Sequence, residues 1–312
     1  MIHSVLGGGV TALCCATALS DRGLDVEVIV PDGAPEPASR FAGGMLAPFC
    51  EGESAPERIV AEGQAAVTWW ATHLPDVVQR GTLVVAPPRD VSELERFARA
   101  TRQHEWVAPG DLEPDLAGRF ARGLFFPGEA HLDPRRALSS LESRLKSRGV
   151  WFRSGMPRGR IIDCRGLASH EELADLRGVR GEMLIVHAPD VTLTRPVRLL
   201  HPRFPCYIVP RDEGRYMIGA TMVESARRGG VTARAAMELL SAAYTLHPGF
   251  AEAEVLELGA GLRPSFPDNI PAIRHAADRI HVNGMYRHGF LMAPVCAQQL
   301  ATELVELYAH AN

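Results

Sequence analysis

The sequence predicts a mixed α/β fold (α+β overall), in which a Rossmann-like dinucleotide-binding domain is interleaved with a domain built on an antiparallel sheet. The first twenty residues give a strand, a glycine turn and a helix, the start of a dinucleotide-binding unit. From residue 181 the pattern changes to short apolar runs separated by turns, which favours antiparallel strands. A second turn leading into a helix follows at 284–289.

Length and composition set the broad class. A chain of 312 residues can hold one large or two intertwined domains. A net charge of −4 argues against a broad nucleic-acid-binding surface, and no apolar stretch reaches the roughly eighteen residues of a membrane span. The six cysteines form no C-x-x-C pair, so we expect buried thiols and a cytoplasmic location. Lys146 is the only lysine, which nearly excludes lysine chemistry and makes a lone arginine weak evidence.

The N-terminal motif is G-x-G-x-x-A, with Gly7, Gly9 and Ala12 at its fixed positions. Gly7 permits a tight turn after the strand, and Gly9 lets the backbone approach a pyrophosphate. Ala12 lets the helix pack close to the strand. Free N–H groups at the helix start would then face the phosphates. A glycine turn that only packs is the alternative.

The second strand, expected over 24–30, lacks the acid that usually ends it and holds the adenosine ribose. Val30 stands at that place, Pro31 follows, and Asp32 comes two residues late. We expect Asp32 to contact the adenosine end of a cofactor.

The rest of the chain alternates between helix and strand patterns. Helices are expected over 54–73, 92–104, 134–149, 232–247 and 290–309. Strands are expected over 80–86, 150–153, 161–166, 182–187, 196–201, 206–210, 215–220, 255–262 and 280–283, whereas 107–131 is expected to be loop-rich. His170 lacks a second histidine at the H-E-x-x-H spacing, so no metal site is predicted.

Eight stretches in the same order resemble the D-amino acid oxidase-like FAD family, and within it the glycine oxidases of thiamine biosynthesis. They are residues 7–9 (GGG), 42–48 (AGGMLAP), 180–182 (RGE), 200–201 (LH), 207–211 (YIVPR), 219–222 (GATM), 261–264 (GLRP) and 286–294 (YRHGFLMAP). The resemblance implies an FAD-binding domain over 1–76, 131–175 and 259–312. It implies a substrate domain over 77–130 and 176–258.

The resemblance also assigns site residues. Arg263 of G-L-R-P would grip the substrate carboxylate with help from Tyr207, Arg287 would lie near the site, Met45 would lie by the flavin and Met222 would line the pocket. The expected FAD contacts are Gly7, Gly9, Ala12, Asp32, Arg40, Ala42, Gly43, Gly44, Met45, Gly166, His288, Gly289, Phe290, Leu291 and Met292.

The implied reaction is oxidation of glycine or another small amino acid to the imine, with O2 reduced to H2O2. The imine would serve thiazole formation, so a thiazole-forming enzyme is an expected partner, as is a second copy of the chain in a homo-oligomer. Two departures stand out: the missing acid at Val30, and a connector at 155–160 that is shorter than in relatives.

Three alternatives stay open from the sequence. One is a related sarcosine, proline or D-amino acid oxidase, or a dehydrogenase with another electron acceptor. Another is an NAD dehydrogenase, which the first motif alone would permit. The third is a flavin-binding protein without turnover.

Overall fold

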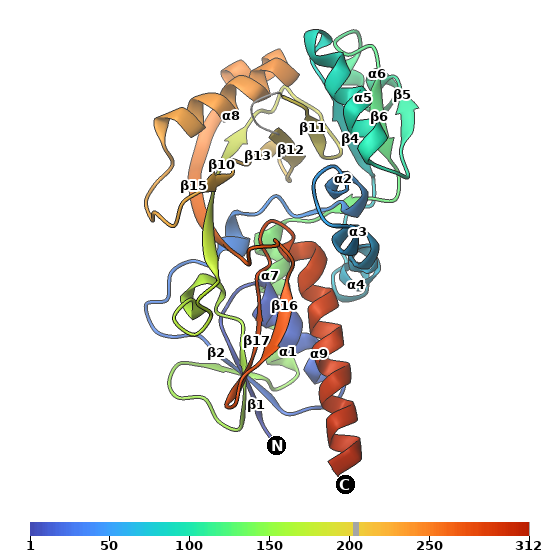
Figure 1. Cartoon of the computed structure of the whole chain (residues 1–312). Coiled ribbons are helices and arrows are strands. Elements are labelled where there is room, and N and C mark those ends of the chain that lie inside the picture. The colour runs from blue at the N-terminus through green and yellow to red at the C-terminus, as the bar shows by residue number, and fades with distance from the viewer. Residues whose placement is uncertain (202–205, 312) are drawn as a thin grey trace.

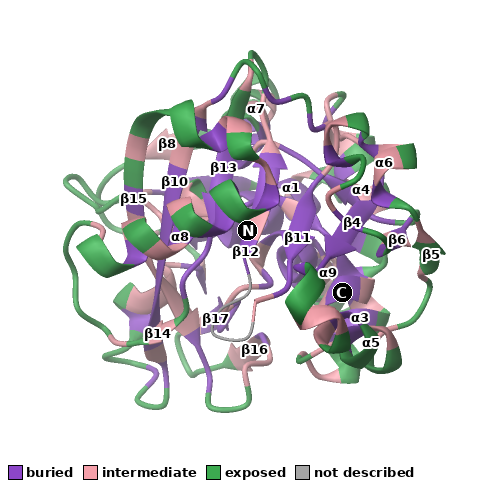
Figure 2. Ribbon diagram, turned by 90° about the horizontal axis from the view of Figure 1, so that it is seen from above, coloured by how far each residue is buried: buried purple, intermediate pink, exposed green. Residues whose placement is uncertain are grey.

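The computed structural model of the protein describes residues 1–201 and 206–311, and it places two sheets one above the other (Figure 1). The first sheet lies in the half that holds both chain ends. The second sheet lies in the other half, beneath α8 (Ala233–Leu246). Purple, buried strands run through the middle of the molecule and green, exposed segments surround them (Figure 2).

The first sheet has the order β16-β17-β9-β1-β2-β8. Its strands are β16 (Ala272–His275), β17 (Arg279–Asn283), β9 (Arg160–Asp163), β1 (His3–Leu6), β2 (Val26–Ile29) and β8 (Trp151–Arg153). All neighbours pair in parallel except β16, which is antiparallel to β17. Parallel strands with helical crossovers are the dinucleotide-binding arrangement that the first motif predicts.

Three helices pack together beside this sheet: α1 (Val10–Asp21), α7 (Pro134–Ser147) and α9 (Gly289–Ala311). Helix α1 contacts both of the others. Its residues from Val10 to Leu19 are all buried, as expected for a helix that is apolar on every side. Gly23 follows the helix with φ +74°, the left-handed conformation that ends many helices.

The second sheet has the order β14-β10-β13-β12-β11-β4-β6-β5, and β15 pairs with β10. Its strands are β14 (Val223–Glu224), β10 (Arg177–His187), β13 (Arg215–Gly219), β12 (Cys206–Pro210), β11 (Val197–Leu199), β4 (Thr82–Val85), β6 (Gly123–Phe126), β5 (Glu105–Val107) and β15 (Glu254–Ser265). Only β11 and β4 pair in parallel, so the predicted antiparallel sheet is confirmed.

Between the two sheets lie short elements that bring several loops together. They are β3 (Met45–Leu46), β7 (Ala130–His131), α2 (Pro48–Glu51), α3 (Glu57–Gly63) and α4 (Ala65–His73). Helices α5 (Val91–Ala100) and α6 (Pro109–Leu112) instead lie beside β4, β5 and β6 of the second sheet (Figure 1). Single turns of 3-10 helix occupy Ala38–Phe41, Pro88–Asp90, Pro114–Leu116, Gly166–Ser169 and Pro248–Glu252. No helix in the described part of the chain is long and apolar enough to cross a membrane.

Several sequence predictions of local structure were wrong. The helix expected over 54–73 is two helices that meet at Gln64, and Pro56 rather than Ser54 precedes the first. The loop-rich stretch contains strands β6 and β7. Strand β15 runs through residue 259, where the FAD-binding domain was expected to resume, so one strand passes from one expected domain to the other. The domain boundaries themselves stay a prediction.

The short connector between β8 and β9 is held by a buried carboxylate. Glu27 on β2 is 1% exposed and accepts hydrogen bonds from Arg153 Nε (2.9 Å), Arg158 Nε (3.1 Å) and Ser4 Oγ (2.6 Å). Burial alone would raise the pKa of Glu27, but these donors outweigh it and lower the pKa to about 2. This ion-pair cluster therefore ties the connector to strand β2 of the first sheet.

Candidate active site

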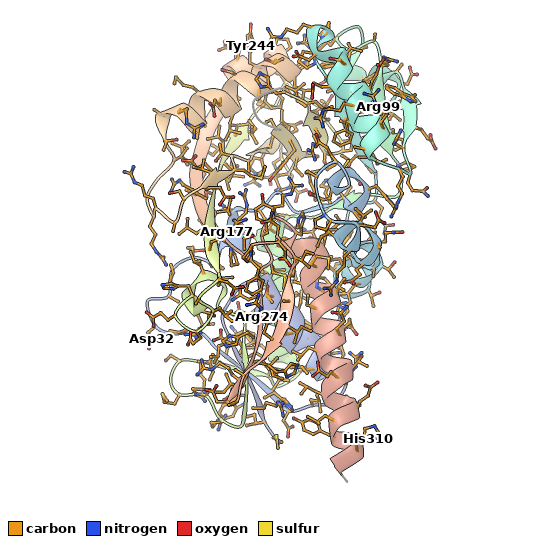
Figure 3. All side chains as sticks on the ribbon, in the orientation of Figure 1. Asp32, Arg99, Arg177, Tyr244, Arg274 and His310 are labelled. Carbon is orange, nitrogen blue, oxygen red and sulfur yellow. The ribbon has the colours of Figure 1, made fainter. Side chains whose placement is uncertain are left out.

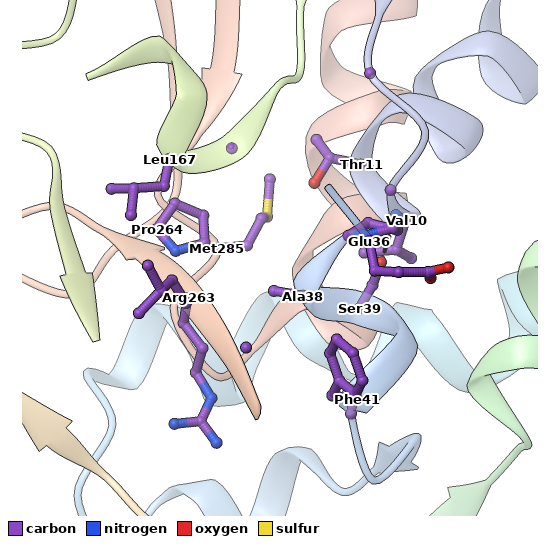
Figure 4. Close-up of a pocket in the computed structure, with 18 of the residues that line it drawn as sticks. Val10, Thr11, Glu36, Ala38, Ser39, Phe41, Leu167, Arg263, Pro264 and Met285 are labelled. Atoms are coloured by element: carbon purple, nitrogen blue, oxygen red, sulfur yellow. Dashed lines mark hydrogen bonds between the residues drawn. The ribbon is translucent and has the colours of Figure 1, made fainter. Parts of the chain in front are cut away.

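A cavity of about 1180 Å³ reaches from the glycine turn after β1 to the second sheet. Residues of both sheets and of the loops between them line it. Figure 4 shows Val10, Thr11 and Ser39 on one side of this cavity and the extended side chain of Arg263 directed away from them. The cavity therefore has a dinucleotide end and an arginine end.

The dinucleotide end is built as the first motif predicts. Gly7 has φ +117°, and a Cβ there would lie 2.8 Å from the Cys164 carbonyl oxygen, so only glycine fits. Gly9 caps α1 without a side-chain hydrogen bond, and no acidic residue stands in the first turn. Ser39 Oγ accepts a hydrogen bond of 3.2 Å from the Val10 N–H. The start of α1 thus offers N–H groups and positive helix-dipole potential to an anion.

The adenosine side carries the departure seen in the sequence. Val30 and Asp32 both line the cavity. Asp32 is exposed and lies at the outer edge of the half with the first sheet (Figure 3). The structure thus places its carboxylate at the cavity edge, and its contact with adenosine stays a prediction.

Fifteen of the nineteen predicted site residues line this cavity. They are Gly7, Gly9, Asp32, Ala42, Gly43, Gly44, Met45, Gly166, Tyr207, Met222, Arg263, Arg287, Gly289, Phe290 and Leu291.

 Val30, which stands where the sequence lacks the expected acid, also lines the cavity. The structure therefore brings most of the predicted site together around one space.

Four predicted residues do not line the cavity: Ala12, Arg40, His288 and Met292. Ala12 is fully buried inside α1, in keeping with its predicted packing role. Arg40 is exposed and pairs with Glu36 at 3.0 Å, so its side chain is directed to the surface. His288 and Met292 are buried at the start of α9. For these two the prediction concerned the backbone, and it stays a prediction.

The A-G-G-M stretch packs against both halves of the molecule. A Cβ on Gly43 would lie 2.6 Å from Tyr207 Cε2, so this glycine leaves room for the tyrosine ring. Gly44 has φ +72°, and a Cβ there would lie 2.9 Å from Pro134 Cδ. Met45 follows in β3 and lines the cavity. The stretch thus presents bare backbone to the space between the two sheets.

Arg263 on β15 has no acidic partner within ion-pair distance among the described residues. Its Nη1 donates to the Thr221 carbonyl oxygen at 3.0 Å. The guanidinium lies over Gly181, where a Cβ would be 2.6 Å from Nη1. Burial lowers the pKa of Arg263, and the nearby Tyr207 opposes that shift. A half-buried guanidinium that lines the cavity without a carboxylate partner suits an anionic ligand.

Arg287 lies in a different electrostatic setting. Its Nη2 is 2.7 Å from Glu51 Oε2 and donates to Ser54 Oγ at 2.6 Å. Burial lowers its pKa, but Glu51 outweighs that and the pKa is raised. Met222 Sδ lies 4.0 Å from Arg287 Nη1 and accepts a hydrogen bond of 3.2 Å from the Tyr286 hydroxyl. Arg287 is therefore already neutralised within the protein.

Sequence reasoning assigned no site role to Glu51 and Tyr286, which line this end of the cavity, or to Ser54, which accepts a hydrogen bond from Arg287. Glu51 is the first acid after the A-G-G-M-L-A-P stretch, a signal that could have been used. Ser54 was assigned to a helix start instead. Tyr286 has φ +47°, a left-handed conformation that is uncommon for a bulky residue and clusters at functional sites. Nothing in the sequence shows that conformation.

A buried carboxyl beside the site gives a test of stability against pH. Burial raises the pKa of Glu129 to about 7, although the Cys50 N–H donates to it at 2.8 Å. An acid with a raised pKa stabilises the fold below its unfolded pKa, and that contribution is lost as pH rises through the folded pKa. Wild-type protein should therefore lose on the order of 3 kcal/mol of unfolding free energy between about pH 4.5 and about pH 7 through this group.

The variant Glu129→Gln keeps an oxygen to accept from Cys50 and cannot ionise. The free energy of unfolding is measured with urea at about pH 5 and about pH 8. It should differ less between the two pH values for the variant than for wild type. An equal difference for both proteins would mean that Glu129 ionises normally in the fold.

The residues at the dinucleotide end fit FAD. A diphosphate needs N–H donors and positive potential, and the start of α1 supplies both without a competing acidic side chain. The first turn of α9 likewise carries no acidic residue, and Gly289 and Phe290 face the cavity. Gly43 leaves room for the Tyr207 ring, and both residues line the same cavity. Among the described residues no three His, Cys, Asp or Glu side chains are grouped to hold a metal ion.

Comparison with known proteins agrees with this geometry. The chain is 52% identical over 312 residues to the putative thiamine biosynthesis oxidoreductase ThiO of Rhizobium etli, covering 96% of this chain and 95% of that protein. It is 25% identical over 347 residues to a bifunctional ThiO/ThiG protein of Trichormus variabilis, covering 97% of this chain and 52% of that protein.

A glycine oxidase of Geobacillus kaustophilus is 25% identical over 351 residues, covering 97% of this chain and 92% of that protein. The crystal structure of glycine oxidase from the same organism superimposes with a TM-score of 0.80 at 21% identity, covering 98% of this chain and 94% of that chain. The family model described as DAO, FAD dependent oxidoreductase, matches residues 4–303. The chain therefore belongs to the DAO family of FAD-dependent oxidoreductases.

Proposed function

We propose that this protein oxidises glycine, or a similarly small amino acid, to the imine in an FAD-dependent reaction. The observation that carries the proposal is the half-buried guanidinium of Arg263, which has no acidic partner within ion-pair distance among the described residues and lines the cavity. The name of the Rhizobium etli relative supports a place in thiamine biosynthesis.

The reaction balances as a two-electron oxidation. The neutral amine loses a hydride from Cα and a proton from nitrogen, and the C=N bond of the imine forms. When bound, FAD supplies the oxidising group that takes the hydride, and O2 is then reduced to H2O2. No lysine takes part, since Lys146 is exposed and paired with Glu142 at 2.6 Å.

The residues of the arginine end would orient the substrate. Arg263 would hold the carboxylate through two parallel N–H donors, which fix its direction as well as its charge. Tyr207 stands beside Arg263 and would add a hydroxyl contact. Met45 and Met222 would make the remaining surface apolar and limit the water in the site. Fixing the carboxylate in this way holds Cα at one place in the cavity.

The partners follow from the same proposal. The substrates are a small amino acid and O2, and the imine would be used by a thiazole-forming enzyme. Bifunctional relatives in which a ThiO part is joined to a ThiG part support such a partnership. We propose a cytoplasmic homo-oligomer in which 1–76, 131–175 and 259–312 bind FAD and 77–130 and 176–258 bind substrate.

Anaerobic addition of glycine to the purified holoprotein tests the proposal. We expect the absorbance of the oxidised flavin to bleach and to return when O2 is admitted, with release of H2O2. Sarcosine, proline and D-alanine serve as comparison substrates. Faster bleaching by one of these would favour the related oxidase, recovery only with another acceptor would favour a dehydrogenase, and no bleaching by any amine would favour a flavin-binding protein without turnover.

A further inference from the structure

Two arginines at the substrate end of the cavity, Arg263 and Arg287, have different partners. Arg263 contacts a backbone carbonyl and no carboxylate among the described residues. Arg287 is paired with Glu51 at 2.7 Å. Both line the same cavity, and the positive charge of Arg287 is one of the causes that lower the pKa of Arg263, after burial. Of these two arginines, only Arg263 is without a carboxylate partner among the described residues and so is available to an anionic ligand.

Glu51 is placed to keep Arg287 occupied. Glu51 ends the short helix α2, and Arg287 lies in the turn just before α9 begins at Gly289. Glu51 Oε2 and Ser54 Oγ both contact the same guanidinium nitrogen, Nη2. The side chains of Glu51 and Arg287 are only 19% and 16% exposed, so solvent screens the pair weakly. Glu51 also lies 3.5 Å from His288 Nδ1.

This arrangement matches the charge of the site to a ligand with one carboxylate. A first carboxylate can pair with Arg263. A second carboxylate that reached toward Arg287 would meet the negative charge of Glu51 or would have to displace it. Like charges brought together in a desolvated site cost binding energy, and such repulsion is a common source of specificity.

We propose that Glu51 is a specificity-determining residue that excludes dicarboxylic amines by withholding Arg287 from a second carboxylate. It acts through Arg287 and is a positioning residue for that guanidinium. The inference rests on the proposed function, because it takes Arg263 as the group that holds the substrate carboxylate.

The variant Glu51→Gln tests this directly. It keeps the size of the side chain and removes its charge, so Arg287 becomes available. Two ligands that cannot be oxidised as amines report on the site: glycolate, with one carboxylate, and diglycolate, with two. Their dissociation constants are measured on the holoprotein from the flavin absorbance change and from the ligand-dependent rise in Tm. We expect Glu51→Gln to improve diglycolate binding relative to glycolate by about tenfold or more.

Three variants serve as controls. Glu62→Gln removes a charge from helix α3, where Glu62 pairs with Arg58 at 2.8 Å and does not line the cavity. It should leave the ratio of the diglycolate and glycolate dissociation constants unchanged. Glu51→Gln combined with Arg287→Ala should lose the gain, because the gain depends on Arg287. Ser54→Ala removes the hydrogen bond from Arg287 Nη2 to the Ser54 hydroxyl, and it should improve diglycolate binding relative to glycolate by a smaller amount. It also tests the proposal if Glu51→Gln does not fold.

The outcomes are separable from those of the proposed function. Folded Glu51→Gln that binds both ligands in the wild-type ratio overturns the inference, as does a gain that survives the loss of Arg287. Wild-type protein that binds glycolate but oxidises no amino acid overturns the proposed function and leaves the ligand ratio measurable. As a second readout, kcat/KM for iminodiacetate relative to glycine should rise in Glu51→Gln.

Discussion

Arg263→Ala should abolish most glycine oxidation while the protein keeps its fold and its FAD. The guanidinium is half-buried in the cavity and no carboxylate among the described residues pairs with it, so the ligand is its expected partner. Losing one partner of a buried ion pair costs about 3–5 kcal/mol, which corresponds to a fall of about 10²–10³-fold or more in kcat/KM. Steady-state kinetics with glycine measure the loss, and the flavin spectrum reports the FAD content.

Two comparisons identify the carboxylate as the group that Arg263 holds. An amine without a carboxylate is a poor substrate from the start and should lose far less activity in Arg263→Ala. Arg263→Lys should recover only part of the activity, because an ammonium lacks the two-pronged fit of a guanidinium. Normal glycine oxidation by Arg263→Ala, or loss of FAD and fold, would contradict the assignment. Arg287 would then be the next candidate, in a form freed from Glu51.

The dinucleotide end could be predicted from the sequence because its determinants are local. A strand, Gly7, Gly9 and the start of a helix lie within a few residues, and turn chemistry decides their conformation. The observed φ of +117° at Gly7 is the expected consequence. The change to an antiparallel sheet after residue 181 could be predicted for a similar reason, since short apolar runs separated by turns record strand pairing.

The electrostatic state of the substrate end could not be predicted in this way. Whether Arg287 is free depends on Glu51, which is far away in the sequence and meets it only in the folded chain. One arginine can bind a ligand while another is paired with a carboxylate of the protein, and this depends on which side chains meet in the folded chain. The resemblance to the family pointed to Arg263 and Arg287 together, and the structure separates them by their partners.

The strands within 105–131 were missed for another reason. Glu105 and Trp106 of β5 are both exposed, so this edge strand has no buried face to give an alternating pattern. Strand β7 and its partner β3, which lies earlier in the chain, contain two residues each, too few for an alternating pattern to be recognised. The helix over 54–73 was predicted as continuous because neither Gly63 nor Gln64 is a strong breaker on its own.

Gly181→Ala should impair the site as a consequence of how Arg263 is placed. Gly181 lies on β10, which pairs with β15, the strand that carries Arg263. The guanidinium of Arg263 lies directly over Gly181. A Cβ at this position would be 2.6 Å from Arg263 Nη1 and closer still to Nη2 and Cζ, so the guanidinium must move. A misplacement of about 1 Å in a group that orients substrate can cost about 10²-fold in rate. We expect kcat/KM for glycine to fall by about that factor while FAD stays bound.

Gly178→Ala is the matched control on the same strand, because a Cβ there meets Leu167 Cδ2, the flexible end of a side chain, at 2.9 Å and lies away from Arg263. It should change kcat/KM little. The double variant Gly181→Ala with Arg263→Ala gives the sharper result. If the glycine acts through the guanidinium, the double variant loses no more activity than Arg263→Ala alone, since the group to be displaced is already gone. Losses that add would instead mean that Gly181 supports the strand rather than the arginine.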